Sequence, residues 1–253
     1  MKKVFVKSIS NYERFRTGIS AVEERGAQEA SLLLVTGEAG FGKSETVDHW
    51  AVHNNATYLR AKVEWTPHYF MSELAEALKI DTRGRAKDLF GRIAGVIGGQ
   101  QLPLVIDEIE HCLRDNAQVL EAIRDLTDLT EVLTILVGMD LAQARIARHA
   151  QIASRVAHVV TFQAATLDDT AEFCRKLAEI TIQPDLVGEI HRQSSGRVRE
   201  ILNAIAACER IALRHGATSI SLADMAGHVL THDWQARRPR VVRGAPALAA
   251  GGR

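Results

Sequence analysis

The glycine-rich turn "GEAGFGKS", residues 37–44, constrains the fold of this chain more than any other stretch. It follows the continuous apolar run "SLLLVT" (31–36), whose length and composition predict a strand buried on both faces of a sheet. Residues 43–53, which come next, are expected to form a helix. Glycines between a strand and a helix let successive backbone N–H groups converge on one point, because no side chain stands in the way.

The spacing within this turn indicates what those N–H groups bind. Gly37, Gly42, Lys43 and Ser44 fit the pattern G-x-x-x-x-G-K-[ST] of a phosphate-binding loop, in the strand–turn–helix context that the pattern requires. The N-terminus of the helix favours the same anion, Lys43 reaches the terminal phosphates, and the Ser44 hydroxyl is placed to ligate Mg²⁺. The predicted nucleotide-binding residues of the loop are Gly37, Glu38, Ala39, Gly40, Phe41, Gly42, Lys43, Ser44 and Glu45.

A second motif, "LPLVIDE" (102–108), supplies two carboxylates at the end of another apolar strand. Open α/β sheets bind ligands at the carboxyl ends of their strands, so this pair is expected beside the phosphate loop. Asp107 is predicted to hold Mg²⁺, directly or through water. Glu108 is predicted to orient or deprotonate the water that attacks the γ-phosphate, which favours hydrolysis over nucleotide binding alone.

The rest of the chain divides into an α/β part and a helical part. Strands are expected at 31–36, 56–63, 102–108, 132–138 and 157–162, with helices between them, which predicts a parallel sheet flanked by helices. From 167 to 230 only helical periodicity is found, and Asp168 or Asp169 fits the start of its first helix. The expected organisation is an N-terminal arm and helix (1–30), an α/β core (31–164), a small all-helical lid (165–232) and a basic, disordered tail (233–253).

Composition excludes some classes of protein. The formal net charge is +0, so any nucleic-acid partner has to be held by a local patch. No apolar run approaches the roughly 20 residues of a membrane span, and the first residues do not form a signal peptide. Cys112, Cys174 and Cys208 lack metal-type spacing and are expected to be reduced thiols of a cytoplasmic protein.

The phosphate loop, "LVIDE" and "SSGRVRE" (194–200) together resemble the AAA+ ATPases over about residues 1–232. In that family a lid arginine touches the γ-phosphate, which implies this role for Arg199, with Arg197 as the alternative. AAA+ proteins also form rings or helices in which an arginine before the fifth strand completes the neighbouring subunit's site. The resemblance implies Arg155 here, with Arg145 and Arg148 as alternatives. The polar sensor residue expected after the fourth strand has no clear match, although Asp140 or Thr134 could serve.

Within the AAA+ proteins, "KVFVKSISNYERF", "LVIDEIEHC" and "LVGMD" are similar to the ATPases that help Mu-like phages and related transposons choose target DNA, the Mu phage transposition protein B type. The resemblance implies a Mg²⁺-dependent ATP hydrolase in the bacterial host cytoplasm. It also implies ATP-dependent filaments on double-stranded DNA, with little sequence preference, that recruit or stimulate a transposase. That type carries an N-terminal helix-turn-helix domain for which we find no room before the core. DNA contacts are therefore expected from the module or the tail.

Basic residues after the second strand are the candidates for such contacts. "TRGRAKDLFGR" (82–92) has a local excess of positive charge in a neutral chain, and Arg60 and Lys62 end the strand before it. The predicted DNA-binding residues are Lys62, Arg83, Arg85, Lys87 and Arg92. Related ATPases remain as alternatives, namely a helicase loader or replication initiator, or a secretion-associated ATPase. His111 and Glu110 are interpreted as surface or second-shell residues, since phosphoryl transfer requires neither.

Overall fold

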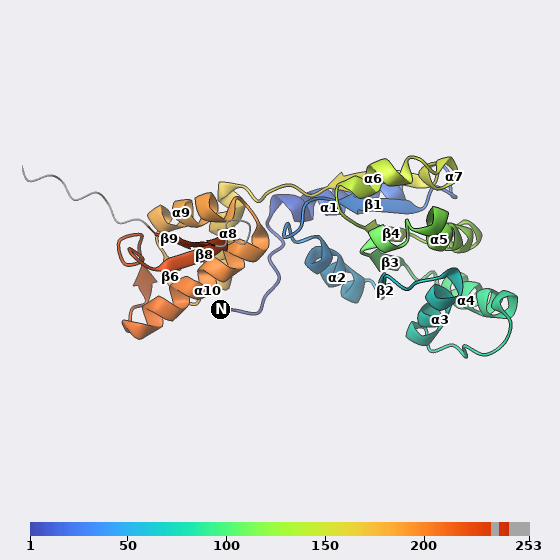
Figure 1. Cartoon of the computed structure of the whole chain (residues 1–253), viewed down its shortest axis with the longest axis horizontal. Helices are drawn as coiled ribbons and strands as arrows, with labels where there is room; N and C mark the ends of the chain where they lie inside the picture. The colour runs from blue at the N-terminus through green and yellow to red at the C-terminus, as the bar shows by residue number, and fades with distance from the viewer. Residues whose placement is uncertain (234–237, 243–253) are drawn as a thin grey trace, which may run out of the picture. The chain divides into compact units, whose positions relative to one another are not determined.

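The structure is a computed structural model that describes residues 1–233 and 238–242. Its described residues form two compact units, one of residues 11–163 and one of residues 1–10 together with those from 164 onward. Each unit is described by itself below. Figure 1 labels most of the helices and strands of both units.

A five-stranded parallel sheet organises the first unit. Its strands are β1 (Leu32–Thr36), β2 (Thr57–Arg60), β3 (Leu104–Asp107), β4 (Thr134–Val137) and β5 (Val156–Thr161). Their order in the sheet is β2-β3-β4-β1-β5, and all pairs are parallel. Every residue of β1, β3 and β4 is buried, which explains why these strands are mostly apolar. The predicted parallel sheet is confirmed.

Helices cover both faces of this sheet, as predicted. They are α1 (Ser10–Glu23), α2 (Lys43–His53), α3 (Pro67–Ala77), α4 (Ala86–Gln100), α5 (Gln118–Thr130), α6 (Leu141–Ile146) and α7 (Ala150–Ala153), with short 3-10 turns η1 (Ile109–His111) and η2 (Asp115–Ala117). Alternate residues of β1 point to opposite faces. Leu33 and Val35 pack with α1 and α2, whereas Leu32 and Leu34 pack with residues of α3 to α7.

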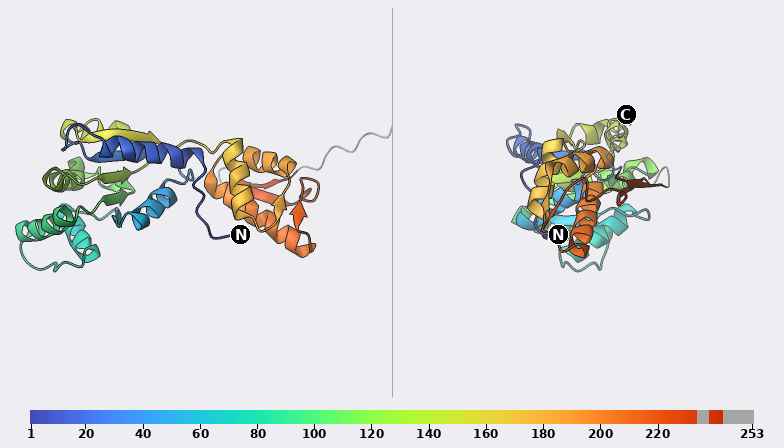
Figure 2. Two further views of the ribbon diagram at one scale, coloured as in Figure 1. Left: turned by 180° about the vertical axis from the view of Figure 1, so that it is seen from behind. Right: turned by 90° about the vertical axis from the view of Figure 1, so that its left-hand side faces the viewer.

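Helix α1 lies close to β1 and β5 (Figure 2). Gly18 permits this approach, because a Cβ there would collide with the side chain of Val160 and come within 3.2 Å of Leu33. Helix α1 therefore packs directly against β1, the strand that leads into the glycine-rich turn.

The second unit contains α8 (Leu167–Leu177), α9 (Pro184–Ser194) and α10 (Val198–Arg214). Thr166, and not Asp168 or Asp169, is the N-cap of α8. Its hydroxyl accepts from the N–H of Asp169 at 3.0 Å, and Asp169 accepts from the N–H of Thr166 at 2.9 Å, a capping box. Residues 1–10 extend along this unit without a strand, and the Lys2 N–H donates to the Leu177 carbonyl at 2.7 Å.

Short strands accompany these helices, which the periodicity did not predict. β6 (Thr181–Ile182) pairs with β7 (Ser219–Ile220), and β8 (Val229–Asp233) pairs with β9 (Arg238–Val241). The helix expected over 221–230 is wrong, because turns and then β8 occupy this segment. The Asp224 carboxylate accepts from the N–H and hydroxyl of Ser221 at 2.8 and 2.7 Å, and Gly227 has φ 79°, so the chain turns instead of coiling.

The predicted tail, 233–253, is in part a strand. β9 pairs antiparallel with β8, Val242 is buried, and the Arg240 guanidinium donates to the Gln193 carbonyl. Residues 234–237 and 243–253 lie outside the described residues, so the prediction of disorder is not addressed there.

Two further sequence expectations concern thiols and membranes. Cys112, Cys174 and Cys208 are buried and unpaired, and burial raises the pKa of each thiol to about 12. Among the described residues, none of the helices has the length and apolarity to traverse a bilayer.

Candidate nucleotide site

The glycine-rich turn has the backbone conformation that its glycines allow. Gly37, Gly40 and Gly42 have φ values of 144°, 90° and 86°, which residues with a Cβ rarely adopt. A Cβ on Gly37 would also lie 2.7 Å from the carbonyl oxygen of Phe162, at the end of the neighbouring strand. Gly42 is the N-cap of α2, so the turn leads directly into a helix N-terminus whose free N–H groups favour an anion.

Lys43 is buried at the base of this turn, with 9% of its surface exposed. Its Nζ donates to the carbonyl oxygen of Glu38 at 2.9 Å and to that of Gly37. Burial lowers the pKa of Lys43, while the charges of Asp140 and Glu110 oppose this shift. The site therefore holds a buried cation among oxygen acceptors, which is suited to receiving a phosphate.

The acid pair follows β3, as predicted. Asp107 is 3% exposed, and its Oδ1 accepts from the N–H of Glu108 at 2.9 Å. Glu108 has φ 57°, a left-handed turn, and its side chain is half exposed. The two carboxylates thus differ in environment. Asp107 is enclosed and held by donors, whereas Glu108 is open to solvent from which a water can approach.

Two residues of β2 contact the acid pair, and sequence reasoning missed one of them. The Tyr58 hydroxyl donates to Oδ2 of Asp107 at 2.7 Å. Arg60 Nη2 lies 3.6 Å from Oδ2 of Asp107, and its Nε lies 3.8 Å from Oε1 of Glu108. Burial and the neighbouring Asp107 raise the pKa of Tyr58, so the phenol stays protonated. No local signal marks these contacts, because they depend on how β2 and β3 pair.

The tip of β4 is shaped by the turn after the acid pair. Glu110, interpreted from sequence as a surface or second-shell residue, accepts the N–H of Met139. A Cβ on Gly138 would lie 2.8 Å from Ile109 and 3.0 Å from the Glu110 carboxylate, so a larger residue there would require these side chains to shift. Thr134 is buried at the start of β4, at the opposite edge of the sheet, which excludes it as the sensor residue.

The donor set fits a magnesium ion. Ser44 lies in the first turn of α2 and Asp107 ends β3, so both follow the carboxyl ends of parallel strands at the edge of the sheet where the glycine turn lies. A hydroxyl and a carboxylate are the hard oxygen ligands that Mg²⁺ prefers, alongside phosphate oxygens. Among the described residues, no group of three or more histidine, cysteine, aspartate or glutamate side chains could hold a metal without such a phosphate.

Comparison with known proteins agrees with this geometry. Residues 25–146 match a family model described as an AAA domain. The core of this chain has the fold of an AAA+ domain, a parallel sheet flanked by helices. The matched segment contains the glycine turn, the lysine and the acid-ended strand just described.

Two solved structures share the fold of the AAA domain and the helices that follow it. Cdc6p from Pyrobaculum aerophilum is 16% identical, with a TM-score of 0.63, over 88% of this chain and 68% of that chain. The Aeropyrum pernix Orc1 protein in complex with DNA is 18% identical, with a TM-score of 0.59, over 87% of this chain and 63% of that chain. The chain thus spans about two thirds of the length of these proteins. A search of curated proteins finds no match.

The arginine expected to act on a neighbouring subunit lies away from its own phosphate loop. Arg155 directly precedes β5, and its carbonyl accepts the N–H of Leu32, the first residue of β1, at 3.0 Å. Arg155 therefore lies where the parallel strands begin, at the edge of the sheet opposite the phosphate loop. Its Nε donates to Asp128 at 2.7 Å. Of the alternatives, Arg145 donates to the Leu113 carbonyl at 3.2 Å and Arg148 is exposed. A role in another subunit stays a prediction.

The lid arginines belong to the second unit. Arg197 is the N-cap of α10, and Arg199 is exposed in its first turn. Gly196 has φ 68°, and a Cβ there would lie 2.6 Å from the Ala165 carbonyl, so this glycine is required where α10 begins. The contact of Arg199 with a γ-phosphate stays a prediction.

The basic residues predicted to bind DNA partly contact other residues of the first unit. Lys62 pairs with Glu73, and Arg85 Nε lies 3.3 Å from Asp88. Arg92 donates to the Asp81 carbonyl at 2.9 Å and to the Arg83 carbonyl. The side chains of Arg83 and Lys87 are exposed.

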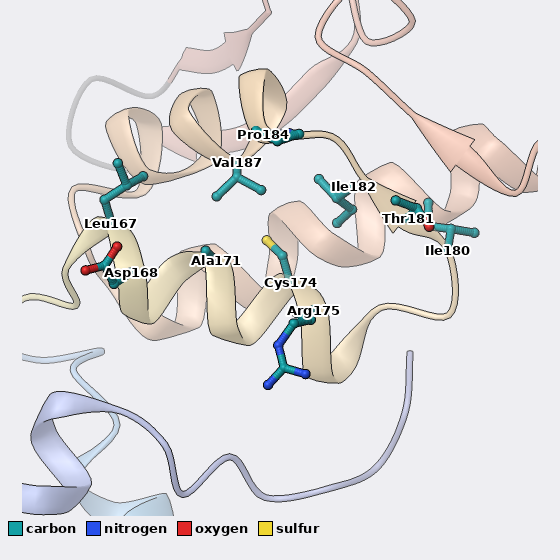
Figure 3. Close-up of a pocket in the computed structure, with 10 residues that line it drawn as sticks. All are labelled: Leu167, Asp168, Ala171, Cys174, Arg175, Ile180, Thr181, Ile182, Pro184 and Val187. Atoms are coloured by element: carbon teal, nitrogen blue, oxygen red, sulfur yellow. The ribbon is translucent and has the colours of Figure 1, made fainter.

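A separate cavity of about 500 Å³ lies in the second unit, among α8, β6 and the start of α9 (Figure 3). Its lining is mostly apolar and includes Leu167, Ala171, Cys174, Ile180, Ile182 and Val187. Arg175, the one basic side chain among the described residues that line it, donates to the carboxylate of Glu172 at 2.8 and 2.7 Å. Such a cavity does not suit a phosphate group.

Proposed function

We propose that this chain is an ATP-dependent, DNA-binding AAA+ ATPase that assembles on duplex DNA and recruits or activates a transposase. The observation that carries the ATPase part is the buried Lys43 in its glycine cradle, at the same sheet edge as the enclosed Asp107 and the exposed Glu108. The matched AAA domain supports the same part.

The residues have distinct roles in this proposal. Lys43 and the N–H groups of the turn bind the terminal phosphates, while Ser44 and Asp107 hold Mg²⁺. The metal, when bound, neutralises charge on the β- and γ-phosphates. Glu108 accepts the proton of the attacking water, for which its half-exposed position is suited.

The DNA-binding part rests on charge and on one comparison. The side chains of Arg83 and Lys87 are exposed and present positive charge, and the Orc1 protein was solved in complex with DNA. Binding of this kind comes mainly from counterion release and is largely independent of sequence, so its affinity falls steeply with salt. Arg83→Ala combined with Lys87→Ala should weaken binding to random-sequence duplex DNA. The slope of the logarithm of the binding constant against the logarithm of the salt concentration should fall in magnitude by roughly 2.

The transposition part rests on the resemblance of "LVIDEIEHC" and "LVGMD" to the Mu-type ATPases. Replication initiation is the second candidate, favoured by the fold shared with Cdc6p and Orc1. Stimulation of strand transfer by a transposase encoded next to this gene supports the first. Loading of a replicative helicase without any effect on strand transfer supports the second.

Assembly is tested by electron microscopy with ATP, with and without random-sequence duplex. Filaments that require both ligands support the proposal, and the absence of DNA binding at low salt contradicts it.

Arg155 is proposed to act on the neighbouring subunit's nucleotide, and Asp128 provides the matched control. Arg155→Ala should lower hydrolysis only in the assembled state, whereas Asp128→Asn should not. If both variants lower hydrolysis in the assembled state equally, the effect of Arg155 comes from its ion pair with Asp128 and not from the neighbouring subunit's nucleotide.

Arg199 is proposed as the lid arginine that contacts the γ-phosphate. Arg199→Ala should weaken ATP binding more than ADP binding, because only ATP has a γ-phosphate. Arg197→Ala is the comparison, since Arg197 is the alternative from the same motif.

A further inference from the structure

The carboxylate of Asp107 is held by donors from two elements. The Tyr58 hydroxyl donates to Oδ2 at 2.7 Å, and the N–H of Glu108 donates to Oδ1 at 2.9 Å. A buried carboxylate has lost its water, so its oxygens require donors from the protein. Asp107 is 3% exposed, and the phenol is therefore a main source of its hydrogen bonding.

Sheet register and packing fix the direction of the phenol. In the parallel pair β2–β3, Tyr58 lies opposite Val105 and Arg60 lies opposite Asp107. The Tyr58 ring packs against the core cluster that contains Val105 and the apolar residues of α2, the helix that begins at Lys43. The hydroxyl thus reaches Asp107 from a ring that the core holds in place.

A competing partner stands next to the carboxylate. Arg60 Nη2 lies 3.6 Å from Oδ2 of Asp107, beyond a normal hydrogen bond, and the Arg60 side chain is 59% exposed. Without the Tyr58 hydroxyl, Oδ2 would lose its nearest donor and could rotate toward the guanidinium. In that position the carboxylate would be paired with a cation of the protein and less available to a metal ion.

We propose that Tyr58 is a positioning residue for Asp107, whose hydroxyl keeps the carboxylate oriented for Mg²⁺ at the nucleotide site. This inference rests on the proposed role of Asp107 in magnesium binding. Partners of this kind, which orient a metal ligand, commonly change metal affinity by roughly 10- to 100-fold when they are removed.

Tyr58→Phe in the full chain tests the proposal, because it removes only the hydroxyl. The readout is the Mg²⁺ concentration that half-saturates binding of a fluorescent, non-hydrolysable ATP analogue. The expected result is an increase of about tenfold, with unchanged affinity for the analogue in EDTA. Tyr69→Phe is the matched control, since Tyr69 lies on α3 with its ring facing Lys62 and should leave both values unchanged.

Asp107→Asn separates failure of this inference from failure of the proposed function. If Asp107→Asn leaves the Mg²⁺ requirement unchanged, the magnesium role of Asp107 is wrong, and the role of Tyr58 is wrong with it. If Asp107→Asn raises the requirement and Tyr58→Phe does not, only the positioning role is overturned. Equal weakening by Tyr58→Phe with and without Mg²⁺ would also overturn it, since the hydroxyl would then support the fold of the site and not the metal.

Discussion

The Nζ of Lys43 donates to the backbone carbonyl of Glu38 across 2.9 Å, so the lysine of the phosphate loop is bound by its own turn. The carbonyl of Gly37 accepts from the same ammonium group. A buried ammonium group requires acceptors, and these carbonyls provide them without a ligand. Phosphate oxygens are charged acceptors and form stronger hydrogen bonds than neutral carbonyls.

Lys43→Met should therefore separate folding from ligand binding. The variant keeps the length of the side chain and removes a buried charge, so the nucleotide-free chain should unfold at a temperature equal to or above that of the wild type. ATP with Mg²⁺ should raise the unfolding temperature of the wild type and not that of Lys43→Met. The measurement is thermal unfolding with and without ligand, and equal stabilisation of both proteins would contradict the role of Lys43.

Glu108→Gln should retain nucleotide binding and slow hydrolysis. The amide cannot accept a proton from water, and loss of a general base commonly lowers the rate by roughly 10²- to 10⁴-fold. Because ATP then persists, assemblies on DNA should last longer. Steady-state phosphate release measures the rate. A normal rate in Glu108→Gln would show that another group activates the water.

Much of the fold could be predicted because buried parallel strands have a strong local signal. The runs at 31–36, 102–108 and 132–138 contain β1, β3 and β4, and each is largely apolar because both faces of these strands are covered. The glycine turn could likewise be predicted, since the required conformations leave few residue types.

What the sequence did not predict depends on pairing between distant segments. The contact of Tyr58 with Asp107 requires the register of β2 against β3, which no residue near either position encodes. Strand β8 was missed because residues 221–230 have helix-compatible spacing, whereas the Ser221–Asp224 turn directs the chain otherwise. Strand β9 was missed because residues 233–253 were interpreted as a disordered tail. The ion pair between Lys62 and Glu73 was missed because it depends on how α3, which carries Glu73, packs near the end of β2.

Gly37→Ala should destabilise the first unit. The new Cβ would lie 2.7 Å from the Phe162 carbonyl and would require φ near 144°. Overpacking and backbone strain together are expected to cost about 2–4 kcal/mol of unfolding free energy. Denaturant unfolding measures the change. Gly91→Ala in α4 is the control, since nothing lies within 4 Å of its Cβ and alanine should stabilise the helix by roughly 0.5–1 kcal/mol.

Asp169 should give the second unit a pH-dependent stability. Burial alone raises the pKa of Asp169, but hydrogen bonds from Thr166 and Ser10 outweigh it, and the net pKa lies below the usual 3.8. A lowered folded-state pKa means that the carboxylate stabilises the fold above pH 3.8, and this stabilisation is lost as pH falls through the folded value.

Asp169→Ala should accordingly lower the free energy of unfolding by about 1–2 kcal/mol at pH 7, where the capping box and the Ser10 contact are intact. The difference in unfolding free energy between Asp169→Ala and the wild type should be smaller at pH 3. Asp168→Ala, at the exposed neighbouring position, should cost less at both pH values. Denaturant unfolding at the two pH values provides the comparison. A difference that stays constant with pH would mean that the charge of Asp169 contributes nothing.

The measurement that tests the central claim most directly is an equilibrium titration of the full chain with fluorescently labelled ATP in the presence of Mg²⁺. The account predicts saturable binding of one nucleotide per chain, reduced at least about 100-fold by Lys43→Ala, because the variant loses a charge-assisted contact to the phosphates. Absence of binding to the wild type, or equal binding by Lys43→Ala, would contradict it.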